Sequence, residues 1–436
     1  MFFKRIITPG LAIQTYLIGD EKCRKMAIID PVRIIAPYLE IAKDKGFEIA
    51  LILETHVHAD FVSGAPELKA CLGGTPQIIC SATGGEKWIP AYADKTVTDG
   101  QSVRMGTLTF QAVATPGHTP EHVSWLLKDQ GGAEELFSGD FLFVGDVGRP
   151  DLLGEKEKKK LANELYRSIF EGLKGFSDSL KILPAHGAGS LCGKNIGKSN
   201  QTTLGHERKN NPAFQKKSKE TWIRNLMQDM PPAPPYFERM KKINVRGAPI
   251  LGLDLPGKQR LQNIQKGAFL LDLRPAEEFA KGHLQGAVNI PMSSQLSYWA
   301  GWIVPYERPL VLVLAEGQTP NEAIKALLLI GLDEIQGYVQ GGGPETIGKI
   351  EAHQLNGFHL VDVRSELEFH SGHIEGAQHI PLGKLPKEID KVPKDRPVAV
   401  ICRAGYRSAI GASLLTKAGL DAYSVQGGMV AWEKTR

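Results

Sequence analysis

The sequence has no hydrophobic run that approaches the roughly 18 uninterrupted apolar residues of a membrane span. Cysteine is scarce: five residues among 436, widely spaced and without a Cys-x-x-Cys pair, argue against a disulfide scaffold or a zinc ribbon. Net charge is also small, with 52 basic and 48 acidic residues, which argues against a nucleic-acid partner. The segment 1–20 carries charges too early for a signal peptide. We therefore expect a cytoplasmic protein with neither a membrane nor a nucleic-acid partner.

The composition is that of an ordinary globular protein, with 42% hydrophobic and 23% charged residues. The length suggests about three domains. A Pro-rich stretch at 228–236 opposes both helix and sheet and indicates a boundary or linker. We predict domains at 1–240, 241–350 and 351–436.

Short apolar runs that end in polar residues dominate the first half of the chain. They lie at 12–20, 26–31, 50–60, 77–81, 108–118, 123–129 and 135–143, with helical patterns at 34–46 and 161–173 between some of them. This order predicts an α/β fold of stacked sheets with helices outside. Polar residues at the strand ends should then converge at one edge.

An internal repeat occupies the second half. Residues 270–291 match 360–381 at an offset of 90, and residues 310–332 match 398–420 at an offset of 88. A strand, a short loop and a helix recur in each copy. The repeat predicts two small α/β domains, each with a mostly parallel sheet.

Potential metal ligands stand at the predicted strand ends of the first half. The segment ETHVHADFVSG carries His56, His58 and Asp60, and further candidates are His118, Asp140 and His186. Imidazole and carboxylate together suit a divalent first-row metal. The pattern therefore predicts a metal site.

These residues resemble the His-x-His-x-Asp-His signature of the metallo-β-lactamase fold, an αββα sandwich, over about residues 1–240. Phe61 stands where the final His of the signature helps to hold a second metal. A phenyl ring has no lone pair, so we expect one metal per chain. Two His and one carboxylate with open positions suit non-haem Fe(II) and O₂, although such ligands also accept zinc or manganese.

Among members of that fold, the persulfide dioxygenases use such a triad, and the resemblance places it at His56, His118 and Asp140. It leaves His58, Asp60 and His186 as groups that orient the ligands or as remnants of a second site. Whether His58 binds the metal directly stays open.

The same resemblance covers two further segments. Arg149, in VGRPDLL, matches an arginine that lies near the sulfur substrate in the persulfide dioxygenases. Cys192, in HGAGSLCGK, resembles the bacterial persulfide dioxygenases fused to rhodanese domains and is expected to line the pocket. The alternatives are a surface arginine in a turn and a buried cysteine without a role.

The last repeat contains the loop CRAGYRS after an apolar strand-like run. Its N–H groups should form an anion-binding nest around Cys402, and Arg403 and Arg407 add two cations, so we expect a lowered thiol pKa. The loop resembles the rhodanese family over about 355–436. That implies that Cys402 accepts sulfur and that Gly405 and Tyr406 belong to the loop that binds the substrate. The first repeat has Leu314 at the equivalent position, which predicts a silent copy.

The resemblance as a whole implies a persulfide dioxygenase fused to one silent and one active rhodanese domain. Its expected partners are a low-molecular-weight thiol persulfide, O₂, sulfite and thiosulfate, and its expected role is sulfide detoxification. A glyoxalase II-like thioester hydrolase is the first alternative, and a sulfur-relay or sensing protein is the second. No motif specifies the oligomeric state, although related proteins often self-associate into homo-oligomers.

Overall fold

The computed structural model describes residues 1–129, 132, 134–215 and 217–435. These residues fall into two compact units, each described by itself below. The first contains Met1–Asp254 with Leu328–Gly331, and the second contains Leu255–Leu327 with Leu332–Arg436. No described helix combines the length and the apolar character that a bilayer crossing requires. The boundaries at 240 and 350 stay predictions.

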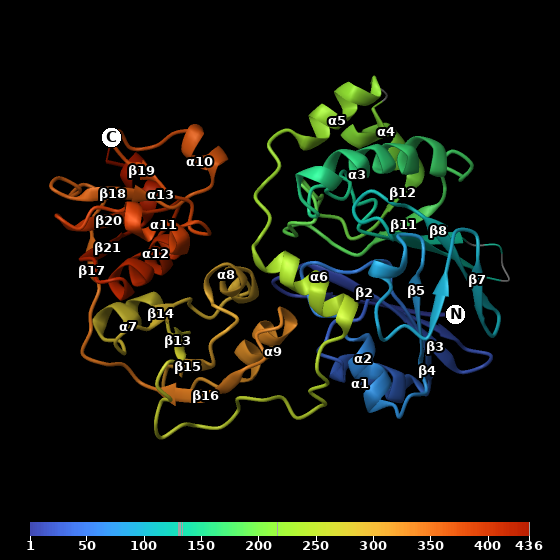
Figure 1. Ribbon diagram of the computed structural model, residues 1–436, viewed down its shortest axis with the longest axis horizontal. Coiled ribbons are helices and arrows are strands. Elements are labelled where there is room, and N and C mark those ends of the chain that lie inside the picture. The colour runs from blue at the N-terminus through green and yellow to red at the C-terminus, as the bar shows by residue number, and fades with distance from the viewer. Residues whose placement is uncertain (130–131, 133, 216, 436) are drawn as a thin grey trace. The chain divides into compact units, whose positions relative to one another are not determined.

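Two mixed sheets stack face to face in the first unit (Figure 1). One has the order β1-β2-β3-β4-β5-β6 and the other β12-β11-β10-β9-β8-β7. Residues of both inner faces, such as Leu53, Trp125 and Phe137, share one buried core. The strands are β1 (Phe2–Thr8), β2 (Ile13–Asp20), β3 (Lys25–Ile29), β4 (Glu48–Leu53), β5 (Gln77–Ser81), β6 (Lys95–Val97), β7 (Ser102–Met105), β8 (Leu108–Ala114), β9 (Val123–Lys128), β10 (Glu134–Gly139), β11 (Lys181–Pro184) and β12 (Thr202–Thr203).

Helices cover the outer faces of both sheets. Helix α1 contacts β4 and α2 contacts β5, whereas α3 and α5 pack beside the second sheet through a core that includes Leu165 and Trp222. The helices are α1 (Ala36–Lys45), α2 (Ala65–Cys71), α3 (Glu155–Arg167), α4 (Leu204–Asn210), α5 (Lys219–Met227) and α6 (Tyr236–Arg246). The arrangement confirms the predicted αββα sandwich.

Two parallel sheets build the second unit, in the orders β14-β13-β15-β16 and β17-β21-β20-β18-β19. The first contains β13 (Phe269–Asp272), β14 (Val288–Asn289), β15 (Leu310–Leu314) and β16 (Ile335–Gln340), and the second contains β17 (Gly348–Ile350), β18 (His359–Asp362), β19 (Gln378–His379), β20 (Val398–Ile401) and β21 (Ala422–Val425). The helices are α7 (Ala276–Lys281), α8 (Leu296–Ile303), α9 (Asn321–Leu329), α10 (Glu366–His370), α11 (Leu385–Glu388), α12 (Tyr406–Lys417) and α13 (Gly428–Glu433).

The repeat is visible in matching side-chain contacts. Arg274 Nη2 donates to Asp272 Oδ2 over 2.6 Å, and in the second copy Arg364 Nη2 donates to Asp362 Oδ2 over 2.7 Å. All four side chains are buried. The predicted duplication of one parallel α/β fold is therefore confirmed.

Candidate functional site

His56, His118 and Asp140 meet where β4, β8 and β10 end. Antiparallel β9 lies between β8 and β10, so the last two strands point the same way and finish at the same edge. Asp140 Oδ2 lies 3.7 Å from His56 Nε2 and 3.5 Å from His118 Nε2. One ligand atom from each residue lies within 4.8 Å of the others, and all three side chains are buried.

A hydrogen bond at Nδ1 fixes the orientation of each imidazole ring in this trio. Thr55 Oγ1 donates to Asp30 Oδ2 over 2.8 Å and therefore accepts from His56 Nδ1, 2.9 Å away. His118 Nδ1 donates to the carbonyl of Arg149 over 2.9 Å. Both rings consequently carry their proton on Nδ1 and keep a lone pair on Nε2, which is the arrangement of metal-binding histidines.

The carboxylate of Asp140 is oriented in the same manner. His186 Nδ1 donates to Asp140 Oδ1 over 2.6 Å, which leaves Oδ2 for the centre of the trio. Burial raises the pKa of Asp140, but the neighbouring His186 and His56 hold it well below its ordinary value. Burial lowers the pKa of His56 and of His118.

Among the described residues, three buried atoms of the trio have no hydrogen-bond partner: His56 Nε2, His118 Nε2 and Asp140 Oδ2. Buried polar atoms are nearly always satisfied, so a group of unsatisfied ones needs a physical explanation. Two neutral imidazoles and one ionised carboxylate form a donor set that suits a divalent first-row metal. The residues therefore fit a metal ion at their centre.

Asp60 and His186 form an adjoining cluster with Cys192. His186 Nε2 lies 2.8 Å from Asp60 Oδ2, so the ring bridges Asp60 and Asp140. Burial lowers the pKa of His186, but the two carboxylates raise it to about 10. Burial raises the pKa of the Cys192 thiol well above its ordinary value. The contact of Cys192 with a persulfide stays a prediction.

His58 turns away from the trio. Its Nε2 lies 3.2 Å from Asp30 Oδ1 and 3.5 Å from Glu54 Oε2, and these three residues form a separate buried cluster. Burial lowers the pKa of His58, but Asp30 and Glu54 raise it well above its ordinary value. The ring centroid of Phe61 lies 4.2 Å from that of His58. The structure thus favours His58 as a supporting group.

Arg149 links the loops around the site. Its guanidinium is buried and donates to both carboxylate oxygens of Asp151 over 2.7 and 2.8 Å, and to the carbonyls of Leu191 and Pro231. A Cβ on the preceding Gly148 would lie 1.9 Å from the carbonyl oxygen of Asp140, so only glycine allows this loop to approach the site so closely. The substrate contact of Arg149 stays a prediction.

Helix α6 secures the loop that carries His58 and Asp60. Asn244 Nδ2 donates to the carbonyls of His58 and Phe61 over 2.8 and 2.7 Å, and Asn244 Oδ1 accepts from the amide of Ser63 over 2.9 Å. The Tyr236 hydroxyl donates to the carbonyl of Asp60. Sequence reasoning missed these contacts, because nothing in the helix marks Asn244 as different from a surface residue.

Cys402 lies immediately after β20, at the start of the predicted loop. The amide of Gly405 donates to Cys402 Sγ over 3.1 Å, and Ser408 Oγ lies 3.6 Å from the same sulfur. Gly405 has a φ of 106°, a conformation that favours glycine. The side chain of Cys402 is buried. The loop therefore places one backbone amide against the sulfur, and the predicted nest of several amides stays a prediction.

Both arginines of the loop are paired with carboxylates. Arg407 forms a bidentate pair with Glu368, over 2.6 and 2.7 Å, and Arg403 pairs with Glu433 over 2.7 Å. The Tyr406 hydroxyl lies 3.0 Å from Ser293 Oγ in the first copy. Among the described residues, the backbone amide of Gly405 donates to Cys402 Sγ, while the two guanidinium groups bind carboxylates.

The first copy has a different environment at Leu314, the position equivalent to Cys402. That side chain is buried, and the following amide of Ala315 donates to Gln318 Oε1 over 3.0 Å. An apolar side chain thus occupies the position of the sulfur, and a neighbouring amide is already satisfied. These features support the prediction of a silent copy.

The chain matches two family models and several known proteins. The metallo-beta-lactamase superfamily model matches residues 9–186, and the rhodanese-like domain model matches 258–343 and 346–435. A human protein, the mitochondrial persulfide dioxygenase ETHE1, is 32% identical over 187 residues, which are 43% of this chain and 68% of that protein. A hydroxyacylglutathione hydrolase from Methylococcus capsulatus is 33% identical over 171 residues, 39% of this chain and 60% of that protein.

A solved structure covers most of the chain. It is a metallo-beta-lactamase from Staphylococcus aureus subsp. aureus COL, with 34% sequence identity and a TM-score of 0.70, and the match covers 78% of this chain and 98% of that chain. The likeness thus extends beyond the αββα sandwich into the second unit.

Proposed function

Because the chain belongs to the metallo-β-lactamase superfamily, has persulfide dioxygenases among its homologues and carries two rhodanese-like domains, we propose that it oxidises thiol persulfides and transfers sulfur. The products would be sulfite at the metal site and thiosulfate after transfer from Cys402. Such a protein detoxifies the persulfides that sulfide generates.

The first reaction converts RSSH, O₂ and water into RSH, sulfite and two protons. Iron(II) held by His56, His118 and Asp140 would bring O₂ and the persulfide together and pass electrons between them. The chain's own residues hold this arrangement. Thr55 and the Arg149 carbonyl fix the two imidazole rings, and His186 fixes the carboxylate.

The second reaction takes place at Cys402. Its thiolate attacks the outer sulfur of RSSH, the S–S bond breaks, and RS⁻ leaves while Cys402 becomes a persulfide. Sulfite then attacks the outer sulfur of that persulfide, which releases thiosulfate and restores the thiolate. The Gly405 amide, 3.1 Å from Sγ, stabilises negative charge on the sulfur at both stages.

One observation supports the dioxygenase best. Three potential metal-ligand atoms, one each from His56, His118 and Asp140, converge without hydrogen-bond partners among the described residues. His58 instead faces the carboxylates of Asp30 and Glu54. The runner-up is a thioester hydrolase, which the match to a hydroxyacylglutathione hydrolase supports. Dinuclear hydrolases use a second metal to hold the attacking hydroxide. The orientation of His58 and the ring of Phe61 disfavour such a pair.

Two variants test the scheme. We expect Cys402→Ser to consume O₂ with a persulfide at the wild-type rate and to release sulfite in place of thiosulfate. We expect His118→Ala to lose bound iron and O₂ uptake, because it removes one of three ligands, while it still transfers sulfur to cyanide. The measurements are iron content after purification without added metal, O₂ consumption, and separate assays of sulfite and thiosulfate.

Two results would contradict this function. Wild-type protein with two zinc ions per chain, thioesterase activity and no O₂ uptake would establish the hydrolase instead. Undiminished thiosulfate formation by Cys402→Ser would show that Cys402 does not carry the sulfur.

A further inference from the structure

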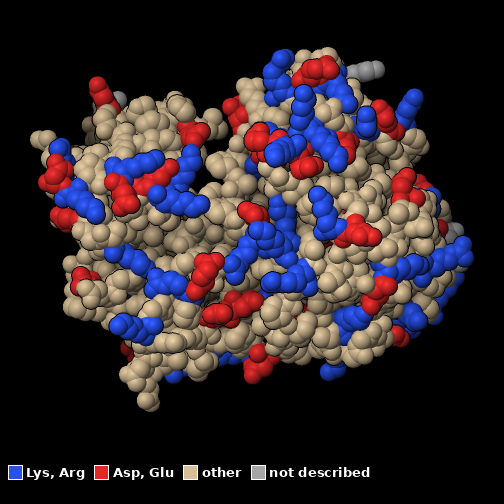
Figure 2. Space-filling view, viewed as in Figure 1, with Lys and Arg blue, Asp and Glu red and all other residues tan. Residues whose placement is uncertain are grey.

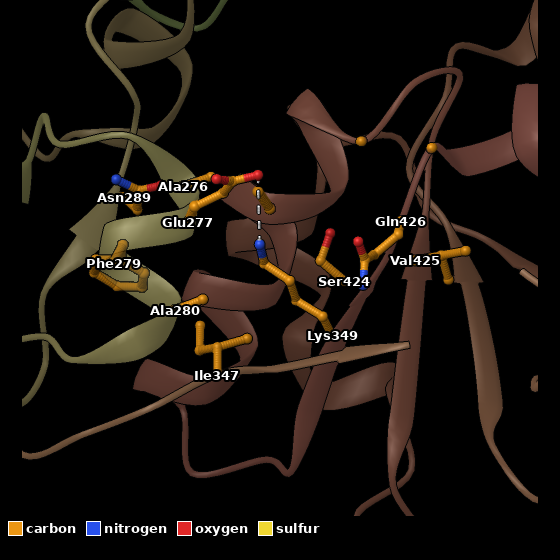
Figure 3. Close-up of a pocket in the computed structure, with 13 residues that line it drawn as sticks. Ala276, Glu277, Phe279, Ala280, Asn289, Ile347, Lys349, Ser424, Val425 and Gln426 are labelled. Carbon is orange, nitrogen blue, oxygen red and sulfur yellow. Dashed lines mark ion pairs between the residues drawn. The ribbon is translucent and has the colours of Figure 1, made fainter. Parts of the chain in front are cut away.

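A cavity of about 180 Å³ lies within the second unit, where the two rhodanese-like copies meet (Figure 3). The first copy contributes α7 and Asn289 to its wall. The second copy contributes Lys349 of β17, Gly405 of the sulfur-carrying loop, and Ser424 and Gln426 at the end of β21. The copy without a nucleophile therefore forms one side of a cavity that reaches the active copy's loop.

Residues in the wall of this cavity connect to the Cys402 sulfur through one or two hydrogen bonds. Gly405, in its wall, donates its amide proton to Cys402 Sγ. Ser424 Oγ, also in its wall, lies 2.9 Å from Ser408 Oγ, which lies 3.6 Å from the same Sγ. A small molecule in the cavity would therefore contact Gly405 and Ser424, the two wall residues that connect to this sulfur.

Asn289 places an unused acceptor in the wall. Its side chain is buried, and its Nδ2 donates to the carbonyls of Asp272 and Arg274 over 3.0 and 2.9 Å. Its Oδ1 has no partner among the described groups. Figure 3 shows the amide nitrogen of Asn289 directed away from Lys349. A buried acceptor without a donor needs a physical explanation, and an N–H group of a ligand in the adjoining cavity would supply one.

A pair of opposite charges stands at the same cavity. Lys349 Nζ lies 3.9 Å from Glu277 Oε1, as the dashed line in Figure 3 marks. This distance is too long for a hydrogen bond, so neither charged group uses its hydrogen-bonding capacity on the other. The relative exposures of the two side chains, 34% for Lys349 and 79% for Glu277, leave both accessible to a small molecule.

We propose that this cavity binds the amino-acid end of the thiol that delivers sulfur to Cys402. Glu277 and Asn289 Oδ1 would accept hydrogen bonds from an α-ammonium group, and Lys349 would donate to the adjoining carboxylate. The cavity is smaller than the roughly 300–1,000 Å³ of sites that enclose drug-sized molecules, so it suits an amino acid or the end of a short peptide. The silent copy thereby determines which thiol persulfide the active copy uses.

This inference rests on the proposed sulfur transfer, but it can be tested without turnover. S-methylcysteine and S-methylglutathione cannot react and carry the same amino-acid group, the first free and the second at a peptide end. Titration calorimetry of each into the full-length Cys402→Ser protein should show saturable binding. Binding of one probe alone identifies whether the free amino acid or the peptide is the ligand.

Two substitutions in the cavity test the proposal, and the first has a matched control. Lys349→Ala should weaken binding of the preferred probe about tenfold, because a charge-assisted hydrogen bond is lost. Lys325→Ala, in the exposed pair of Lys325 with Glu322 on α9, should leave it unchanged. Asn289→His removes the amide oxygen but keeps a hydrogen-bond donor. The second copy has His379 at the equivalent position, and its Nε2 donates to the Arg364 carbonyl. The Asn289→His variant should therefore also weaken binding of the probe.

Sulfur-transfer kinetics give a second measurement with the otherwise wild-type chain. Lys349→Ala should raise the KM for cysteine persulfide or glutathione persulfide about tenfold and leave the kcat for these donors unchanged. The KM for mercaptoethanol persulfide, which lacks the amino-acid group, should also stay unchanged. An equal change for all donors, or no binding of either probe to the Cys402→Ser protein, would overturn the proposed site. Probe binding without any sulfur transfer by wild-type protein would support the site and refute the transferase function.

Discussion

At the scale of single residues, the metal trio depends on a threonine that contributes no ligand. Thr55 Oγ1 contacts both His56 Nδ1 and Asp30 Oδ2, so it fixes the tautomer and the direction of the His56 ring. Thr55→Val keeps the shape of the side chain and removes this contact. We expect the affinity for the proposed iron to fall about 10- to 100-fold, as metal affinity does when groups that orient metal ligands are lost.

Metal titration of the apoprotein measures this effect directly. Thr109→Val, on β8, is the matched control and should bind iron as tightly as wild type. Equal affinities for Thr55→Val and wild type would refute the orienting role of Thr55.

The ion pair between Arg407 and Glu368, beside the sulfur-carrying loop, should make the free energy of unfolding depend on pH. The hydrogen bonds from Arg407 lower the pKa of Glu368 from 4.5 to about 2. Because Glu368 has a lower pKa in the folded state than in the unfolded state, the ion pair stabilises the fold fully above pH 4.5. This stabilisation is lost as the pH falls toward 2. It should amount to about 1 kcal/mol, since solvent screens a partly exposed pair.

Glu368→Gln removes the titrating group. Its free energy of unfolding should therefore fall less steeply than that of wild type between pH 4.5 and 2, in thermal or denaturant unfolding followed at several pH values. The exposed substitution Glu375→Gln should retain the wild-type slope. A Glu368→Gln slope identical to that of wild type would show that the pair contributes nothing.

At the scale of elements, α6 supports the metal site although it supplies no ligand. Asn244 satisfies three buried backbone groups of the loop between β4 and α2. Asn244→Ala leaves all three without partners, so we expect the free energy of unfolding to drop by about 3 kcal/mol. Asn225→Ala, at an exposed position of α5, should change it by less than about 0.5 kcal/mol. Denaturant unfolding of both variants measures these changes, and an equally small change for Asn244→Ala would contradict the supporting role of α6.

The strands could be predicted because apolar runs that end in His or Asp mark where β4, β8 and β10 finish. The same pattern predicted six candidate ligands, and only the resemblance to the persulfide dioxygenases selected His56, His118 and Asp140 among them. The direction of His58 could not be predicted, because it depends on Asp30 and Glu54, which belong to separate strands or follow them.

The pairing of the loop arginines is a further property that sequence could not provide. Arg403 and Arg407 were expected to serve the sulfur as cations, but each is neutralised by a carboxylate from another helix. Nothing in the loop itself encodes Glu368 or Glu433. Local sequence predicts which groups follow a strand, whereas their partners emerge only when distant elements pack together.

At the scale of the whole molecule, the proposed function joins two reactions in one chain, and a small molecule links them. Sulfite is the product of the proposed metal site and the acceptor at Cys402, and each half-reaction balances without the other. We therefore expect an equimolar mixture of His118→Ala and Cys402→Ser proteins to form thiosulfate from persulfide and O₂, since one supplies sulfite and the other supplies the sulfur carrier. Either variant alone should form none.

The mixing experiment separates diffusion from direct transfer. If sulfite moves through solution, the lag before thiosulfate appears should shorten as the concentration of both variants rises, because the second step waits for sulfite to accumulate. Added sulfite should remove the lag and should allow the His118→Ala protein to form thiosulfate by itself. A mixture that accumulates sulfite without thiosulfate, while each variant retains its own half-reaction, would mean that sulfite must pass between sites of one chain.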